Sequence, residues 1–387
     1  MAKILIGGDI FPTPSNEQLF CEGNAEKLIG KELLEDFSAA DFRMFNLEGP
    51  LIEEKTPIAK SGPVFGAPAG TVNGLKNMNI NLISIANNHI FDNGEAGLKS
   101  TIKTLAENNI DCTGSGNCLK EASKPYLFML NGITIGVYSC AESEFSIATE
   151  SGCGANPFDP LESLDDIAKL RENCDYLIVL YHGGKEFYRY PSPYLQKVCR
   201  KIVDKGADIV LTQHSHCIGC MEEYQGSTIV YGQGNFLLAR AENDFTRTGL
   251  LVSVDLKKDN SDGCLSSAVD YIPVIKTSNT VGKAKDNEFS DILSGFFRRS
   301  EEIKSPGFLK NSFENFADAY YERFFSVSLG AVAQNPVFRL LNRLFGKKMA
   351  SKLFRKKDCL TLVNLIRCEA HREVFIHILN KRIGKKP

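Results

Sequence analysis

A short apolar strand followed at once by a polar loop occurs five times in this chain, and this repeated unit constrains the fold most. The five strands are expected at 3–9, 42–48, 80–86, 176–181 and 207–212. Helices are expected between them, at 24–37, 95–108, 165–173 and 193–205. Alternation of buried strands with helices indicates a layered α/β fold, in which ligands gather at the strand ends.

The polar residues at these strand ends are of the kinds that bind transition metals. Four of the six histidines follow predicted strands, and two carboxylates stand in equivalent places: His89, His182, His214, His216, Asp9 and Glu48. Imidazole nitrogen and carboxylate oxygen are the ligands that suit manganese, zinc or iron. The sequence therefore predicts a site for one or two divalent ions.

The segment His214-Ser-His216 has two possible interpretations. In an extended segment alternate side chains share a face, so both rings would point into one site. Cys217 and Cys220 follow at once, and a structural zinc site of the tetrahedral kind is the alternative. That alternative is less favoured, because such sites usually need a second ligand pair and none is evident.

The segment Asn87-Asn88-His89 follows the third predicted strand. Asparagine is an unusual metal ligand, used where a neutral oxygen is wanted. A histidine next to it can stay unligated and donate a proton to a leaving oxygen. The plain alternative is a turn, which asparagines favour.

These residues and their neighbours together resemble the bacterial CapA family of poly-gamma-glutamate and capsule synthesis proteins, over roughly residues 3 to 245. The resemblance rests on motifs in a fixed order: Gly8-Asp9-Ile10, Asn46-Leu-Glu48-Gly-Pro50, Ala86-Asn-Asn-His89, His182-Gly-Gly-Lys-Glu186, His214-Ser-His216 and Tyr231-Gly-Gln-Gly-Asn-Phe236. It implies a calcineurin-like, metallophosphoesterase-like layered α/β fold with a helical appendage at the C-terminus.

The resemblance also implies roles for the site residues. Asp9 and His216 would hold one ion, and Asn88, His182 and His214 the other. Glu48 would bridge the ions, His89 would be the general acid, and a hydroxide formed on the metals would attack phosphorus. Residues expected to contact substrate are Asn46, Asn87, Lys60, Lys185 and Asn235.

One departure from the metallophosphoesterase pattern concerns the first ion. The pattern Asp-x-His would place a histidine at position 11, and this chain has Phe11. We therefore expect one complete metal position, formed by Asn88, His182, His214 and Glu48. The second position, held by Asp9 and His216, lacks a ligand.

Two functions are compatible with such a site. The first is a metal-dependent hydrolase that acts on a phosphoester, or on an amide or acyl bond of a polymer or its precursor. The second is a non-catalytic polymer-assembly protein whose degenerate metal site binds an anionic polymer or precursor. Expected partners are an anionic polymer or phosphorylated small molecule and, in the second case, polymer-synthesis proteins.

We expect a first domain over 1–280 and a helical, basic region over 285–387. From Arg343 to Pro387 there are 13 Lys and Arg against three Asp and Glu. This tail either packs onto the first domain or lies on a membrane surface as an amphipathic helix around 347–357.

Charge and the N-terminus set two further expectations. The net charge of -2 gives no overall attraction to nucleic acid, so no nucleic-acid partner is expected. The apolar run 4–6 is too short for a signal peptide or a spanning helix, so we expect a cytoplasmic protein, which the basic tail could make peripheral to the membrane.

Overall fold

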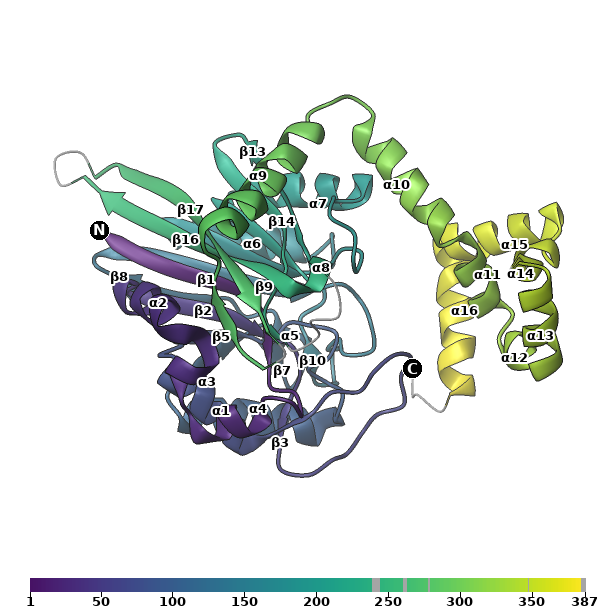
Figure 1. Cartoon of the computed structure of the whole chain (residues 1–387), viewed down its shortest axis with the longest axis horizontal. Helices are drawn as coiled ribbons and strands as arrows, with labels where there is room; N and C mark the ends of the chain where they lie inside the picture. Colours follow the sequence, from purple (N-terminus) through teal and green to yellow (C-terminus); the bar gives the residue numbers. More distant parts are fainter. Residues whose placement is uncertain (239–243, 260–262, 278, 347, 384–387) are drawn as a thin grey trace. The chain divides into compact units, whose positions relative to one another are not determined.

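In the computed structural model, described for residues 1–238, 244–259, 263–277, 279–346 and 348–383, the chain divides into two compact units, Met1–Lys310 and Asn311–Pro387. The first unit is built on two large sheets (Figure 1). In the first sheet the strand order is β18 (Val281–Lys283), β17 (Leu265–Lys276), β16 (Thr248–Lys258), β1 (Ala2–Phe11), β2 (Phe42–Leu47), β5 (Leu82–Ser84) and β6 (Asp111–Thr113). A short strand, β15 (Asn235–Leu238), also pairs with β1.

The second sheet has the strand order β13 (Ile218–Tyr224), β14 (Ser227–Gln233), β12 (Ile209–Gln213), β11 (Tyr176–His182), β9 (Ile133–Ala141) and β8 (Tyr126–Leu130). In both sheets the central strands run parallel, so their carboxyl ends lie at one edge. Smaller pairs join β3 (Leu51–Ile52) to β4 (Ala67–Pro68) and β7 (Ser115–Gly116) to β10 (Gly154–Ala155).

Alternating side chains of the strands divide the interior into three apolar clusters. Ile4 and Ile6 of β1 join Ile178 of β11 in the cluster between the sheets. Leu5 points the opposite way, into a cluster with helices α1 (Glu17–Glu22), α2 (Ala25–Ala39), α3 (Val72–Asn77) and α4 (Gly94–Glu107). The outer face of the second sheet carries α6 (Ser163–Arg171) and α7 (Pro193–Asp204). Strands buried on both faces explain the nearly continuous apolar runs in the sequence.

The predicted layered α/β fold is confirmed. The five predicted strand units are divided between two sheets: β1, β2 and β5 lie in the first, and β11 and β12 in the second. Strand β9, which was not among the five predicted strands, pairs in parallel with β11 over the whole length of β11. The site therefore draws on two sheets.

Helix α9 (Asp286–Glu302) lies within the first unit, although the sequence placed everything after residue 285 in the appendage. Phe296 is fully buried in the cluster between the sheets, where Ile292 and Leu293 also pack. Arg299 donates to the carbonyls of Ile218 and Gly219. The observed division therefore falls later than the predicted one, at residues 310 and 311.

The second unit consists of short helices. They are the end of α10 (Phe308–Ala319), α11 (Tyr321–Ser328), α12 (Ala331–Gln334), α13 (Pro336–Leu344), α14 (Met349–Lys352), α15 (Lys356–Arg367) and α16 (Glu369–Arg382). The amphipathic helix expected around 347–357 is interrupted, because α14 ends at Lys352 and α15 begins at Lys356; Lys347 and the last residues, 384–387, lie outside the described residues. No helix in the described part of the chain is long and apolar enough to cross a membrane.

Candidate metal centre

The side chains expected to bind metal meet where strand ends of the two sheets come together. Three belong to the first sheet, at or just after β1, β2 and β5, and three to the second, at or just after β11 and β12. All six are buried: Asp9, Glu48, Asn88, His182, His214 and His216. The topology thus collects at one place residues that are spread over more than half of the chain.

His182 is the centre of one group of ligand atoms. Its Nε2 lies 3.1 Å from Asn88 Oδ1 and 3.2 Å from His214 Nδ1. Glu48 Oε1 is 3.9 Å from the same nitrogen. Two imidazole nitrogens, an amide oxygen and a carboxylate oxygen converge on one small buried volume, and they belong to the four residues predicted to form the complete metal position.

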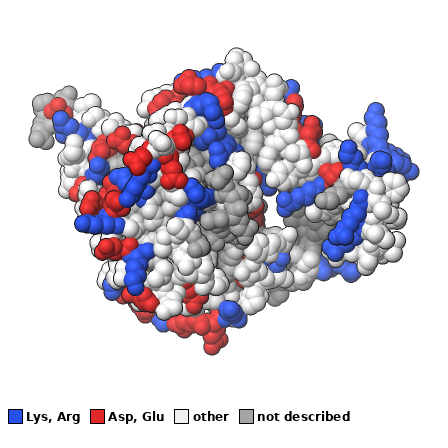
Figure 2. All heavy atoms as spheres, viewed as in Figure 1, with Lys and Arg blue, Asp and Glu red and all other residues white. Residues whose placement is uncertain are grey.

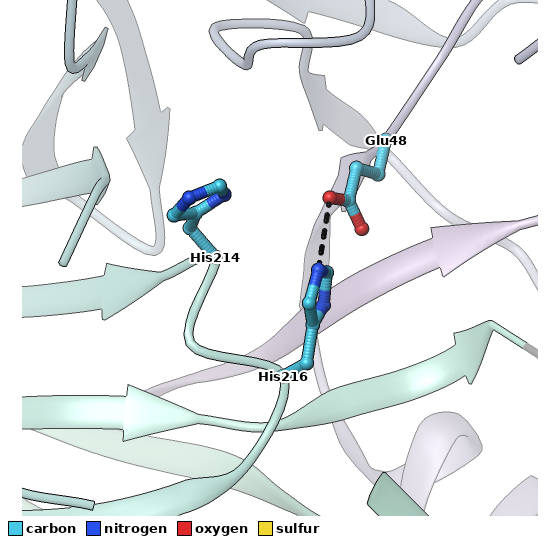
Figure 3. A group of neighbouring side chains, drawn as sticks. All are labelled: Glu48, His214 and His216. Carbon is cyan, nitrogen blue, oxygen red and sulfur yellow. Dashed lines mark ion pairs between the residues drawn. The ribbon is translucent and has the colours of Figure 1, made fainter. Parts of the chain in front are cut away.

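Glu48 also lies next to His216. Its Oε1 is 3.6 Å from His216 Nε2. Ligand atoms of Glu48, His214 and His216 lie within 4.8 Å of one another, and Figure 3 shows these side chains pointing toward each other. The Glu48 carboxylate thus lies near both His182 and His216, which is the position expected of a ligand that bridges two ions.

Asp9 and His216 form the second group. Asp9 Oδ2 lies 3.5 Å from His216 Nδ1, and the same nitrogen is 2.8 Å from Asn235 Oδ1. Phe11 occupies the position at which the metallophosphoesterase pattern has a histidine. Its side chain is buried and stacks on Phe65 at a centroid distance of 5.4 Å. The structure therefore places an aromatic ring, with no ligand atom, at the end of β1.

His214 and His216 reach the site through an unusual backbone. Their φ angles are 83° and 53°, in the left-handed region that non-glycine residues seldom adopt. The expectation of an extended segment is therefore wrong, because β12 ends at Gln213 and the chain coils after it. Both rings still face the site. Such backbone strain is typical of functional positions.

The structural zinc alternative is not supported. Cys217 and Cys220 are buried, and Cys220 packs in the apolar cluster under α7. In the described part of the chain, the His, Cys, Asp and Glu atoms that converge closely enough for a metal are those of Glu48, His214 and His216, with no cysteine among them.

Burial and neighbouring charges shift the pKa values of these groups. Burial lowers the pKa of His182 well below its usual value and that of His214 to about 3. Burial acts in the same direction on His216, but the carboxylates of Glu48 and Asp9 outweigh it and raise its pKa to about 9. Burial opposes ionisation of Asp9, yet the hydrogen bond to His216 and nearby imidazole charge lower its pKa to about 2. At neutral pH, His182 and His214 therefore offer lone pairs beside an ionised Asp9.

His89, the predicted general acid, is paired with a carboxylate that the sequence reading gave no role. Its Nδ1 lies 2.6 Å from Asp92 Oδ2, and its ring stacks on Phe65 at 4.0 Å. Burial lowers the pKa of His89 despite this hydrogen bond. The available sequence signal was the spacing of three residues between His89 and Asp92, which brings the two side chains together in a tight turn.

The residues expected to contact substrate have different surroundings. Asn46 Nδ2 donates to Asp9 Oδ1 at 2.8 Å, and Asn87 Nδ2 donates to Asn46 Oδ1 at 3.1 Å. Asn235 Oδ1 is hydrogen-bonded to His216 Nδ1. The buried amides of Asn46, Asn87 and Asn235 therefore help to hold the candidate ligand side chains in place. The side chain of Lys60 is also buried, with its amine on Asp92 at 2.6 Å. Lys185 is exposed, and its contact with substrate stays a prediction.

The donor set fits a divalent metal ion. Neutral imidazoles, an amide oxygen and ionised carboxylates suit manganese, zinc and iron. Three of the candidate ligand side chains, Asp9, His182 and His216, also have a buried amide beside them, as metal sites usually require. Asn46 Nδ2 donates a hydrogen bond to Asp9 and lies 3.3 Å from His182 Nδ1, while Asn235 Oδ1 is hydrogen-bonded to His216 Nδ1.

Comparison with known families identifies the class of protein. The model of the bacterial capsule synthesis protein family PGA_cap matches residues 3–240. The chain belongs to this family, and the predicted resemblance to CapA proteins is confirmed.

Two curated relatives are similar over the same region. The PGA biosynthesis protein CapA of Bacillus subtilis (strain 168) is 30% identical over 229 residues, which are 58% of this chain and 60% of that protein. The capsule biosynthesis protein CapA of Bacillus anthracis is 29% identical over 246 residues, 61% of this chain and 58% of that protein. The match spans about three fifths of the length of these relatives.

Solved structures with a similar chain path are more distant. They include a novel phosphatase from Mycoplasma pneumoniae, with a TM-score of 0.44, 14% identity, and coverage of 71% of this chain and 93% of that one. A 5'-nucleotidase precursor from Thermus thermophilus has a TM-score of 0.41, 13% identity, and coverage of 76% and 58%. The family assignment rests on the sequence match.

Proposed function

We propose that this chain is a metal-dependent hydrolase that acts on a phosphoester, or on an amide or acyl bond of a capsule polymer or its precursor. The observation that carries the proposal is the His89–Asp92 pair, which directly follows the ligand Asn88 in the chain. A site for binding an ion alone has no need of an oriented imidazole beside the ligands. A site for hydrolysis needs one to protonate the leaving group.

The chain's own residues have distinct tasks in this proposal. The six residues of the centre would hold one or two divalent ions, and a bound ion supplies Lewis acidity and acidifies a water molecule. His89 Nδ1 is occupied by Asp92, so proton transfer to a leaving oxygen must use Nε2. Stacking on Phe65 restricts rotation of the ring.

The names of two relatives and one exposed lysine near the site support the proposed substrate class. The names of the two relatives refer to the biosynthesis of PGA and of capsule. By analogy, an anionic polymer or a phosphorylated small molecule is the proposed substrate. Lys185, exposed three residues after His182, is the proposed anion contact.

Metal content and hydrolysis test the proposal together. Protein purified without added metal is analysed for metals, and turnover of p-nitrophenyl phosphate and bis-p-nitrophenyl phosphate is measured with Mn, Zn and Fe. We expect His182→Ala to lose metal. His89→Ala should keep the metal but lose about 10²- to 10⁴-fold in kcat.

The matched control is His371→Ala, which removes an exposed histidine of α16 and should change neither metal content nor kcat. Absence of both metal and turnover from the wild-type protein, with His89→Ala indistinguishable from it, would overturn the hydrolase proposal.

A second candidate function is a non-catalytic role in polymer assembly. Phe11 favours it, because the position of Asp9 and His216 lacks the ligand that a full two-metal site would have. In this case the centre binds an anionic polymer or precursor, and the helical unit binds polymer-synthesis proteins. Retained polymer binding by a variant with no turnover would support this function.

We also propose a cytoplasmic location with contact between the C-terminal unit and an anionic membrane surface. The cysteines of the described residues form no disulfide, as is usual in a reducing compartment. On the face drawn in Figure 2, blue Lys and Arg side chains gather over the C-terminal helices. Large apolar side chains of the same helices are exposed, among them Leu340 and Leu344 of α13.

A further inference from the structure

Lys60 lies on the loop between β3 and β4, and its side chain is only 2% exposed. Its Nζ donates to Asp92 Oδ1 at 2.6 Å and to the backbone oxygen of Asn88 at 2.9 Å. His89 Nδ1 lies 3.4 Å from the same amine. Two of the three ammonium protons are therefore held by Asp92 and the Asn88 backbone, and the buried side chain is placed for an internal role instead of the substrate contact expected from the sequence.

Asp92 is the link between Lys60 and His89. One oxygen, Oδ1, accepts from Lys60, and the other, Oδ2, lies 2.6 Å from His89 Nδ1 and accepts from the backbone amide of Phe65 at 2.7 Å. The carboxylate is fully buried. A buried carboxylate needs both compensating charge and several donors to hold one orientation. Lys60 supplies the formal positive charge.

The loop that carries Lys60 is itself attached to the turn after β5. The backbone amide of Ile58 donates to the carbonyl of Asp92 at 3.0 Å, and that of Thr56 donates to Asn93 Oδ1 at 2.8 Å. The amine of Lys60 therefore occupies a fixed place relative to Asn88 and Asp92. One side chain connects the backbone of a metal ligand with the carboxylate that orients the general acid.

We propose that Lys60 is a positioning residue that holds Asp92, and through it the His89 ring, in register with the metal centre. The proposal rests on the proposed hydrolase function for its kinetic consequences. Its structural content, the dependence of the His89–Asp92 hydrogen bond on Lys60, stands independently of turnover.

The first experiment is kinetic and compares two leaving groups. p-Nitrophenolate leaves with little need of a proton, whereas phenolate needs one. We expect Lys60→Met to lower kcat for phenyl phosphate about 10- to 100-fold, with a smaller loss for p-nitrophenyl phosphate and an unchanged KM. Lys60→Arg should recover part of the loss, and Lys55→Met, an exposed lysine of the same loop, should behave as wild type.

A double-mutant cycle with Asp92→Asn tests the route of the effect. If Lys60 acts through Asp92, Lys60→Met should cost little further kcat in the Asp92→Asn background. The double variant removes both buried charges together, so it leaves no unpaired charge at this place and keeps the test available even where Lys60→Met lowers stability. Equal losses for both leaving groups, a raised KM or additive effects would overturn the proposal.

The second experiment needs no turnover. In ¹⁵N-histidine-labelled protein, the Nδ1 proton of His89 is assigned by its loss in His89→Gln. We expect this signal in the wild type, Lys60→Arg and Lys55→Met, and its loss in Lys60→Met. Retention in Lys60→Met would overturn the proposal. A Lys60-dependent signal in a protein without turnover would support the positioning role and contradict the hydrolase function.

Discussion

Lys276, the last residue of β17, is another buried lysine, with 2% of its surface exposed. Burial lowers its pKa to about 7, against the attraction of Asp9 and Glu48. The unfolded chain keeps an ordinary lysine, so between about pH 7 and 10 it binds a proton that the folded chain has lost. Stability therefore rises with pH in this window, and the cost of burying the charge is complete below pH 7.

Lys276→Met removes this cost. We expect it to raise the free energy of unfolding below pH 7, by an amount on the order of a few kcal/mol, and to have less effect as pH approaches 10. Urea denaturation at pH 6.5, 8 and 9.5 measures the change. Lys257→Met, an exposed lysine of β16, is the control. A pH-independent difference between Lys276→Met and wild type would contradict the prediction.

Gly49 directly follows the candidate ligand Glu48 and has a φ of 144°. A Cβ there would lie 2.7 Å from the ring of Phe11 and 3.1 Å from Cβ of Phe65. We expect Gly49→Ala to destabilise the fold by about 1 to 3 kcal/mol and to lower metal affinity, because the loop that holds Glu48 must shift. Urea denaturation and metal titration measure the two effects.

Gly62→Ala is the matched control for Gly49→Ala. Its φ of 94° is also positive, but nothing lies within 4 Å of an added Cβ. Gly62→Ala should lower stability only through the strain of an alanine at positive φ, and it should leave metal affinity unchanged. Equal changes in stability and metal affinity in the two variants would show that Phe11 and Phe65 do not constrain the Glu48 loop.

Among the elements, α9 decides where the first unit ends. Its Phe296 is completely buried between the sheets. We expect a chain ending at Lys310 to fold. A chain ending at Ala284 should be strongly destabilised, because the apolar cluster between the sheets loses the side chains of α9. Thermal denaturation of the two truncated chains compares them, and Phe296→Ala in the full chain should cost about 3 to 5 kcal/mol.

Phe297→Ala provides the control on the same helix, because that side chain is 45% exposed. If the chain ending at Ala284 denatured at the same temperature as the chain ending at Lys310, α9 would belong to the appendage, as the sequence suggested.

The sequence predicted the elements well where apolar periodicity is strong. The strands that carry Asp9 and His182, β1 and β11, and the helix α7 were expected within two residues of their observed bounds. The convergence of the candidate ligand side chains was also predictable, because histidines after strands are distinctive, whereas their binding of metal stays a prediction. The division into two sheets was not, since periodicity does not report which strands pair.

The details that position the site were not predictable from local pattern. The left-handed backbone of His214 and His216 depends on tertiary contacts that override the preference of histidine. Lys60 was expected to contact substrate, and its burial was not foreseen because lysine is usually exposed. Its burial depends on Asp92, which is far away in the sequence and near only in the fold.

At the scale of the whole molecule, charge is divided unevenly. From residue 311 onward the chain has 15 Lys and Arg and six Asp and Glu, whereas the overall net charge is -2. The first unit is therefore acidic and the second basic. On α13, exposed Val337, Leu340 and Leu344 lie beside Arg339 and Arg343. Such a combination suits an anionic membrane surface.

Vesicle sedimentation tests this contact with the full chain. We expect binding to vesicles that contain phosphatidylglycerol, weaker binding at high salt, and little binding to pure phosphatidylcholine. The double substitution Arg339→Glu with Arg343→Glu should weaken binding. Lys31→Glu with Lys257→Glu makes the same change in net charge on the first unit and should not. Equal binding to both kinds of vesicle would contradict the prediction.

The origin of the ligands in two sheets has a consequence for assembly. Asp9, Glu48 and Asn88 come from one sheet, and His182, His214 and His216 from the other. Neither half of the chain contains a full set of donors. An ion bound here would cross-link the two sheets, and its binding free energy would add to the stability of their contact. Metal occupancy would therefore report that both halves of the chain are folded and joined.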